Sequence, residues 1–189
     1  MDEPIPHLIL GLWVAWAAYW WAASRGTKSI RRHESVVSRA AHLGPIALAA
    51  ILLAVRSAPG WLGLRWLPLS PVTYWIGVGL VIVGLGFTVW ARVVLGGNWS
   101  ATVTVKHDHE IVRSGPYRWL RHPIYTGLLL AFVGCAVALG EWRGIVAVAI
   151  VWAALWRKLR LEERWLTEEF GTRYSDYRRE TWALIPFVL

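Results

Sequence analysis

Five apolar segments constrain the fold of this 189-residue chain more than any other feature. They cover residues 5–23, 40–55, 71–91, 123–140 and 144–156. A helix needs about 20 apolar residues to cross the hydrocarbon core of a bilayer, within a range of about 17–25. The first four segments meet or approach this length, and the fifth does so if its helix continues beyond the bilayer. We therefore predict an all-α integral membrane protein with five transmembrane helices.

The composition agrees with a membrane location. Hydrophobic residues make up 56% of the chain, and many of its 15 Trp lie near the ends of the apolar segments, as in an interfacial aromatic belt. The net charge of +8 resides mainly in the loops, so we expect membrane lipids and no nucleic acid as partners. Cys135, the one cysteine, lies in an apolar segment and offers no disulfide or thiolate cluster.

The loops predict the orientation. Residues 24–39, residues 92–122 and the chain after residue 156 are rich in Arg and Lys, whereas residues 56–70 and 141–143 are poor in them. Basic loops stay in the cytosol, so the N-terminus should lie outside, with the first and third loops and the C-terminus inside. The acidic start predicts no cleavable signal peptide. The excess of Arg over Lys is typical of a G+C-rich genome, which suggests a multi-pass protein of a bacterial cytoplasmic membrane.

One of the predicted cytosolic loops contains more prolines, aromatic residues and hydrogen-bonding side chains than a simple connector needs. Residues 113–127 contain the pairs Gly115-Pro116 and His122-Pro123, which place Tyr117, His122 and Tyr125 in a stiffened, turn-rich stretch. One interpretation is that these residues are simple interfacial anchors beside a membrane. Their combination at one surface predicts instead a binding site.

The segment after the fifth apolar stretch carries a second group of functional candidates. Helical spacing predicts a stripe that consists of Leu155, Leu159, Glu162 and Leu166. A carboxylate on an apolar stripe needs a partner, because burying it alone is costly. The alternative is a Lys158–Glu162 pair on a solvated face, worth about 0–1 kcal/mol. Glu163 lies off the stripe and is expected to be solvated.

Other common sites have little support. His107 and His109 flank Asp108, but no further ligand stands at a recognisable spacing, so no metal site is predicted. No glycine-rich nucleotide motif is present. The third apolar segment contains four glycines, which we interpret as positions of close helix packing. They are Gly77, Gly79, Gly84 and Gly86.

Six motifs follow one another over about residues 97–187. They are Asn98-Trp-Ser100, His109-Glu-Ile-Val112, Gly115-Pro-Tyr117, Arg121-His-Pro-Ile-Tyr-Thr-Gly127, Lys158 with Glu162-Glu163, and Phe170-Gly-x-x-Tyr174-x-x-Tyr177. In this order they resemble the isoprenylcysteine carboxyl methyltransferase family and the related membrane phospholipid methyltransferases. Residues 1–70 match only as generic membrane helices. The resemblance implies a single domain over residues 1–189, with helices one to three in 1–95 and a catalytic half, with helices four and five, in 96–189.

The resemblance also implies a cofactor and a pocket for it. The family transfers a methyl group from S-adenosylmethionine, which binds on the cytosolic side between the third loop and the C-terminal helix. The residues expected to bind the cofactor are His109, Glu110, Ile111, Val112, Tyr117, His122, Pro123, Ile124, Tyr125 and Glu162.

The acceptor is expected to be a lipophilic small molecule or a lipidated protein. The predicted catalytic residues are Lys158, Arg160 and Glu162: the cations would position an acceptor carboxylate, and Glu162 would hold the cofactor's ammonium. The family often has Arg at the position of Lys158, and Arg157 or Arg160 could replace it. We therefore predict an enzyme like protein-S-isoprenylcysteine O-methyltransferase. The alternatives are a phospholipid or small lipophilic amine N-methyltransferase, with His122 as base, and a non-catalytic membrane helical bundle that binds a ligand.

Overall fold

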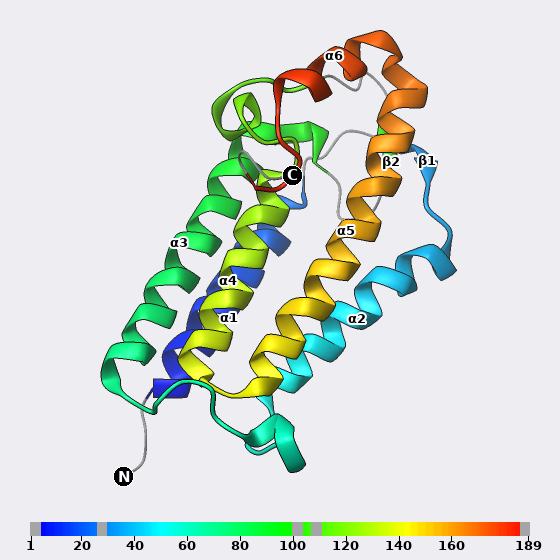
Figure 1. Ribbon diagram of the computed structural model, residues 1–189. Coiled ribbons are helices and arrows are strands. Elements are labelled where there is room, and N and C mark those ends of the chain that lie inside the picture. The colour runs from blue at the N-terminus through cyan, green and yellow to red at the C-terminus, as the bar shows by residue number, and fades with distance from the viewer. Residues whose placement is uncertain (1–4, 26–29, 100–103, 107–110, 186–189) are drawn as a thin grey trace.

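The computed structural model describes residues 5–25, 30–99, 104–106 and 111–185. Five long helices run alongside one another, and a sixth short helix, two short strands and the C-terminal segment lie at one end (Figure 1). The helices are α1 (Ile5–Ala23), α2 (Val36–Ala54), α3 (Pro71–Leu95), α4 (Pro123–Leu139), α5 (Trp142–Phe170) and α6 (Thr172–Glu180). The strands are β1 (Ile30–His33) and β2 (Thr104–Lys106), and short 3₁₀ turns cover Gly60–Gly63, Gly96–Asn98 and Gly115–Arg118.

The helices confirm the all-α prediction, with one small addition. β1 and β2 form an antiparallel pair in which Ile30 lies opposite Lys106, and the sequence did not predict it. The fifth helix continues well past residue 156, to Phe170, which explains its short apolar part. Among the described residues, α2 and the extended α3 are long and apolar enough to cross a membrane, whereas α1 and α4 are apolar but shorter.

Helices α3 and α4 pack backbone against backbone because glycines face each other. A Cβ atom on Gly84 would lie 2.6 Å from the backbone nitrogen of Ala131 and 2.6 Å from the carbonyl oxygen of Gly127. A Cβ atom on Gly77 would lie 2.5 Å from the carbonyl oxygen of Gly134. The predicted role in helix packing is therefore confirmed for these two glycines of α3. The other two face open space.

Helix α5 joins α2 and α4 through an apolar core. Ala147, Val151 and Leu155 of α5 pack with Ala49 of α2 and Phe132 of α4. All five side chains are at most 4% exposed. The first half of the predicted Leu stripe thus faces the protein interior, as the spacing indicates.

A buried arginine fastens the end of the bundle opposite α6. The Arg143 side chain is 2% exposed, and its Nε donates to Glu141 Oε2 at 2.7 Å. Its Nη1 donates to the carbonyls of Leu52 and Val55, at the C-terminal end of α2. The last carbonyls of a helix lack partners within it and carry partial negative charge, so this guanidinium stabilises the end of α2 against α5.

Helix α1 is attached to the bundle by two indoles. Trp13 Nε1 donates to the sulfur of Cys135 at 3.3 Å, and Trp16 Nε1 donates to Thr88 Oγ1 at 2.7 Å. Cys135 is 8% exposed, which confirms it as a small residue of the core. These contacts hold α1 against α3 and α4.

We expect Gly84→Ala to lower the free energy of unfolding by about 1–3 kcal/mol, the usual cost of overpacking, because its methyl group must push α4 away from α3. Gly79→Ala is the matched control, since its Cβ meets nothing within 4 Å. It should be neutral or raise stability by up to about 1 kcal/mol through helix propensity. Thermal unfolding of both variants in detergent micelles checks this. Equal destabilisation would contradict the packing described here.

Candidate functional site

The turn before α4 is held in place by the C-terminal segment. His122 has φ −124° and ψ 57°, outside the helical region, and Pro123 starts the helix at its first position. The backbone N–H of Arg121 donates to the carbonyl of Trp182 at 2.8 Å, and that of His122 donates to Ala183 at 3.1 Å. The residues after α6 thus fix the position of the His-Pro turn.

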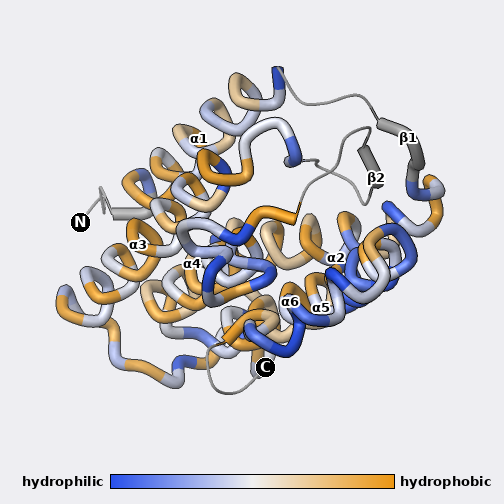
Figure 2. The backbone as a smooth tube through the Cα atoms, turned by 90° about the horizontal axis from the view of Figure 1, so that it is seen from above, coloured by the Kyte–Doolittle hydropathy of each residue, from blue (hydrophilic) through white to orange (hydrophobic). Residues whose placement is uncertain are grey.

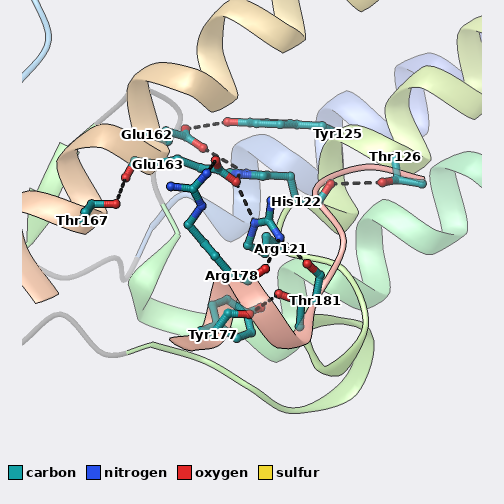
Figure 3. A network of polar contacts seen from close by, with 10 residues as sticks. All are labelled: Arg121, His122, Tyr125, Thr126, Glu162, Glu163, Thr167, Tyr177, Arg178 and Thr181. Atoms are coloured by element: carbon teal, nitrogen blue, oxygen red, sulfur yellow. Dashed lines mark hydrogen bonds and ion pairs between the residues drawn. The ribbon is translucent and has the colours of Figure 1, made fainter. Parts of the chain in front are cut away.

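His122 lies between two carboxylates of α5 (Figure 3). Its Nδ1 is 3.5 Å from Glu162 Oε2, and its Nε2 is 3.4 Å from Glu163 Oε1. The hydroxyl of Tyr125 donates to Glu162 Oε1 at 2.5 Å, and the rings of His122 and Tyr125 stack with centroids 5.3 Å apart. His122 and Tyr125 therefore meet Glu162, as expected for parts of one site, and Glu163 joins them.

The charges of this cluster support one another. Burial by itself would lower the pKa of His122, but the carboxylates of Glu162 and Glu163 raise it on balance. Burial would likewise raise the pKa of Glu162, but His122 and then Lys158 lower it. The cluster therefore favours the protonated form of His122 between two carboxylates. A protonated imidazole cannot accept a proton, so this arrangement does not suit His122 to the role of general base.

Glu163 is buried, and its predicted exposure to solvent is wrong. The residue is 5% exposed, and its Oε1 accepts a hydrogen bond from Arg121 Nε at 2.7 Å. Arg178 of α6 approaches its Oε2 to 3.5 Å. Although burial opposes ionisation, His122 and Arg121 lower the pKa of Glu163 to about 2. The periodicity of α5 could not show this, because α6 and the His-Pro turn cover a face of α5 that its own sequence marks as polar.

A large cavity opens beside this cluster. Its volume is about 1290 Å³, and most of the predicted site residues line it. These are Ile111, Val112, Tyr117, His122, Ile124, Tyr125, Lys158 and Glu162. Pro123 is buried in the first turn of α4, and Arg160 is exposed with its guanidinium 5.9 Å from the ring centroid of Trp156. Neither is among the lining residues, and the predicted His109 and Glu110 lie outside the described residues.

Between its two ends, the cavity is mainly apolar. It extends between α1, α2 and α4 and reaches the loops at the opposite end of the bundle, where Arg65 and Glu141 line it. Its apolar lining includes Trp13, Ile46, Leu53, Leu128 and Phe132. Seen from the α6 end, hydrophilic residues gather in α6 and the end of α5, whereas α1, α3 and α4 carry hydrophobic residues along their lengths (Figure 2). One cavity thus joins a charged end to an apolar interior.

Several further polar residues line the cavity, and three of those not assigned from the sequence have a buried polar atom. Asn98 Oδ1 and the Tyr174 hydroxyl are buried and have no hydrogen-bond partner among the described residues. Both belong to motifs noted in the sequence, so a signal was present. The third is His42 of α2, which is 0% exposed. The sequence could have marked His42, because it is a titratable residue within an apolar segment. Such a residue in a membrane protein commonly has a function.

The fold and the site define a helical membrane protein with a charged pocket at one end of an apolar cavity. Residues 72–173 match the model of the phospholipid methyltransferase family. This match covers more than half of the chain, and the chain belongs to that family.

Curated relatives agree with this assignment. The probable protein-S-isoprenylcysteine O-methyltransferase of Oryza sativa subsp. indica is 30% identical over 122 residues, which cover 61% of this chain and 64% of that protein. The mouse protein-S-isoprenylcysteine O-methyltransferase is 32% identical over 128 residues, covering 65% of this chain and 45% of that protein. The predicted resemblance is therefore confirmed, although the chain spans only about half to two thirds of these relatives.

A solved structure shares the fold. The eukaryotic intramembrane Ras methyltransferase, isoprenylcysteine carboxyl methyltransferase, superposes with a TM-score of 0.57 at 21% sequence identity. The match covers 80% of this chain and 52% of that one. The likeness shows that the two proteins share a helical fold.

We expect Glu163→Gln to lower the free energy of unfolding by about 3–5 kcal/mol, because it removes the carboxylate that balances the charges of Arg121 and His122 in a buried site. The pH dependence follows from the same contacts. The folded-state pKa of Glu163 lies near 2, below the ordinary value of 4.5, so its stabilisation is present above pH 4.5 and is lost as the pH falls from there towards 2.

Thermal unfolding in detergent between pH 3 and pH 7 measures both effects. The unfolding midpoint of the wild type should fall as the pH drops below about 4.5. The midpoint of Glu163→Gln should be lower at pH 7 and should change less with pH. A variant as stable as the wild type at pH 7 would contradict the buried network.

Proposed function

We propose that the protein transfers the methyl group of S-adenosylmethionine to a carboxylate of a lipophilic acceptor, in the manner of isoprenylcysteine carboxyl methyltransferases. One observation carries this proposal: the charged cluster around Glu162 lies where the apolar cavity meets the polar end of the bundle. A polar cofactor and a lipophilic acceptor can meet only at such a junction. Family membership and the names of the relatives support the same reaction.

The residues at the polar end suit this cofactor. S-adenosylmethionine supplies a methyl group on a sulfonium whose leaving group departs neutral, so catalysis depends mainly on positioning. Glu162 is 21% exposed at its side chain and ionised, and it would bind the cofactor's ammonium. Asn98 and Tyr174 offer buried polar atoms that lack partners among the described residues and that a polar ligand would satisfy.

Lys158 is the cation that would position the acceptor. It is 8% exposed, lines the cavity, and its Nζ lies 5.2 Å from the ring centroid of Tyr125. Of the other two cations considered, Arg157 donates to the carbonyl and hydroxyl of Ser38, and Arg160 lies over Trp156. A carboxylate is ionised at neutral pH and needs a cation but no base. Lys158 would repel a protonated amine, and the two carboxylates beside His122 favour its protonated form over a general base, so the geometry favours the carboxylate.

The membrane arrangement belongs to the proposal. We propose that all five long helices cross the bilayer, with α5 projecting beyond it on the side of α6. The N-terminus would lie outside and the charged cluster in the cytosol of a bacterial cell, where the cofactor is available. The basic loops at the α6 end support this orientation.

Cysteine labelling tests the orientation. In a Cys135→Ala background, a cysteine replacing Ser114 should react only from the cytosolic side, because Ser114 is exposed beside the His-Pro turn. A cysteine replacing Leu64, which is 60% exposed in the opposite loop, should react only from outside. The measurement is labelling of intact cells with a membrane-impermeant maleimide, compared with inverted vesicles. Labelling of position 114 in intact cells would remove the site from the cytosol and overturn the proposal.

Cofactor binding tests the assignment of Glu162. Glu162→Gln removes the charge but keeps the size of the side chain and its place in the helix. Losing one charge-assisted hydrogen bond costs about 1.5–3 kcal/mol, so the affinity for S-adenosylmethionine should fall about 10- to 150-fold. Isothermal titration calorimetry on purified protein measures this loss.

Glu169→Gln is the control for that experiment. Glu169 lies on the same helix, is exposed, and is not among the residues that line the cavity. Its substitution removes the same charge and should leave the affinity unchanged. A wild-type protein that binds no S-adenosylmethionine would favour a non-catalytic helical bundle. Equal losses in the two variants would show that Glu162 acts only through the net charge.

A further inference from the structure

The imidazole of His42 is a buried polar group that the proposed reaction does not yet use. It comes from α2, is 0% exposed, and belongs to the residues that line the cavity. Its Nε2 has no hydrogen-bond partner among the described residues. Buried polar groups are almost always hydrogen-bonded, so an unpaired group beside a cavity is characteristic of a site that a ligand completes.

The contacts of its other ring nitrogen indicate where the proton lies. Arg157 Nη1 is aligned for a long hydrogen bond to His42 Nδ1 at 3.5 Å, whereas Glu34 Oε1 stands at an ion-pair distance of 3.5 Å. A guanidinium can only donate, so Nδ1 accepts in the tautomer that pairs with Arg157, whereas pairing with the Glu34 carboxylate would place the proton on Nδ1. A neutral imidazole whose Nδ1 accepts carries its proton on Nε2. In the tautomer that pairs with Arg157, which the proposal below adopts, the unpaired Nε2 of this cavity-lining residue is an N–H donor.

Lys158 of α5 lines the same cavity as His42 of α2. It follows Arg157 on α5, and Arg157 ties α5 to α2 by donating to the carbonyl of Ser38 at 3.1 Å and to its hydroxyl at 2.9 Å. His42 contacts Arg157, the residue before Lys158, and it lines the same cavity as Lys158 and Glu162. The two neighbouring helices thus contribute one donor group each to the same cavity.

We propose that His42 is a specificity-determining residue for the acceptor: together with Lys158, it holds the acceptor's carboxylate between α2 and α5. The proposal rests on the methyl transfer proposed above and names the residues that select the reacting group. The His42 N–H would donate to one carboxylate oxygen, and the Lys158 ammonium would balance the charge. A methyl ester is neutral, so the pair would bind the product less tightly than the substrate.

Two ligands that differ in one group test this selection. N-acetyl-S-farnesylcysteine carries a carboxylate, and its carboxamide has the same shape without the charge. Their binding to purified protein is measured by calorimetry in the presence of S-adenosylhomocysteine, so no transfer occurs. The wild type should prefer the carboxylate. In His42→Phe, the carboxylate affinity should fall about 10- to 150-fold, as for the loss of one hydrogen bond to a charged group, and the carboxamide affinity should fall much less.

Two variants separate selection from a structural role. His42→Gln keeps an N–H donor and should recover part of the preference for the carboxylate, whereas His42→Leu lacks a donor in a smaller side chain and should behave like His42→Phe. In Lys158→Met, the preference should also fall. The affinity of every His42 variant for S-adenosylmethionine should stay within about twofold of the wild type, a difference of less than about 0.4 kcal/mol. The reason is that the proposal places His42 at the acceptor and not at the cofactor.

Several results would overturn the assignment. An unchanged preference for the carboxylate in His42→Phe, or an equal loss for both ligands, would remove His42 from acceptor selection. A parallel loss of S-adenosylmethionine binding would make it a residue of the cofactor pocket. These results leave the proposed methyl transfer intact. If the wild type binds S-adenosylmethionine but prefers the carboxamide, the carboxylate itself is wrong.

Discussion

The ion network of His122, Glu163 and Arg121 is the interaction on which the rest of this site depends. Its members come from the His-Pro turn and from α5, and Arg178 of α6 joins from the far side of the carboxylate. Buried charges are tolerated only when each finds its partner. The network therefore requires the turn, α5 and α6 to meet in one arrangement, and that arrangement also brings Glu162 to the cavity.

The two adjacent carboxylates serve different purposes because they point in different directions. Glu163 faces α6 and the turn and is closed off from solvent, whereas Glu162 faces the cavity and is partly exposed. The first stabilises the fold and the second remains available to a ligand. His122 contacts both, so the stability of the network and the charge of the pocket are coupled through one imidazolium.

Much of the architecture could be predicted because each feature depends on local sequence. The apolar segments gave α1 to α4 and the start of α5 to within a few residues, whereas α5 continues to Phe170. Pro71 and Pro123 occupy the first turns of α3 and α4. The helical stripe correctly placed Leu155 and Leu159 in the core. The distant partners of Glu163 and Arg143 could not be predicted from local sequence. Arg121 lies 42 residues from Glu163 along the chain, and Val55 lies 88 residues from Arg143.

The sequence by itself determined the helical class, the membrane setting and the order of motifs that marks the family, since hydropathy and motif spacing are properties of the linear chain. Only the tertiary structure decided which polar groups share a cavity. His42 lies 116 positions before Lys158 in the printed sequence, yet the pairing of α2 with α5 brings both to one cavity. Arg160, close to Lys158 in sequence, faces away. The physical reason is that a helix turns neighbouring residues to different faces, and only packing decides which face meets the site.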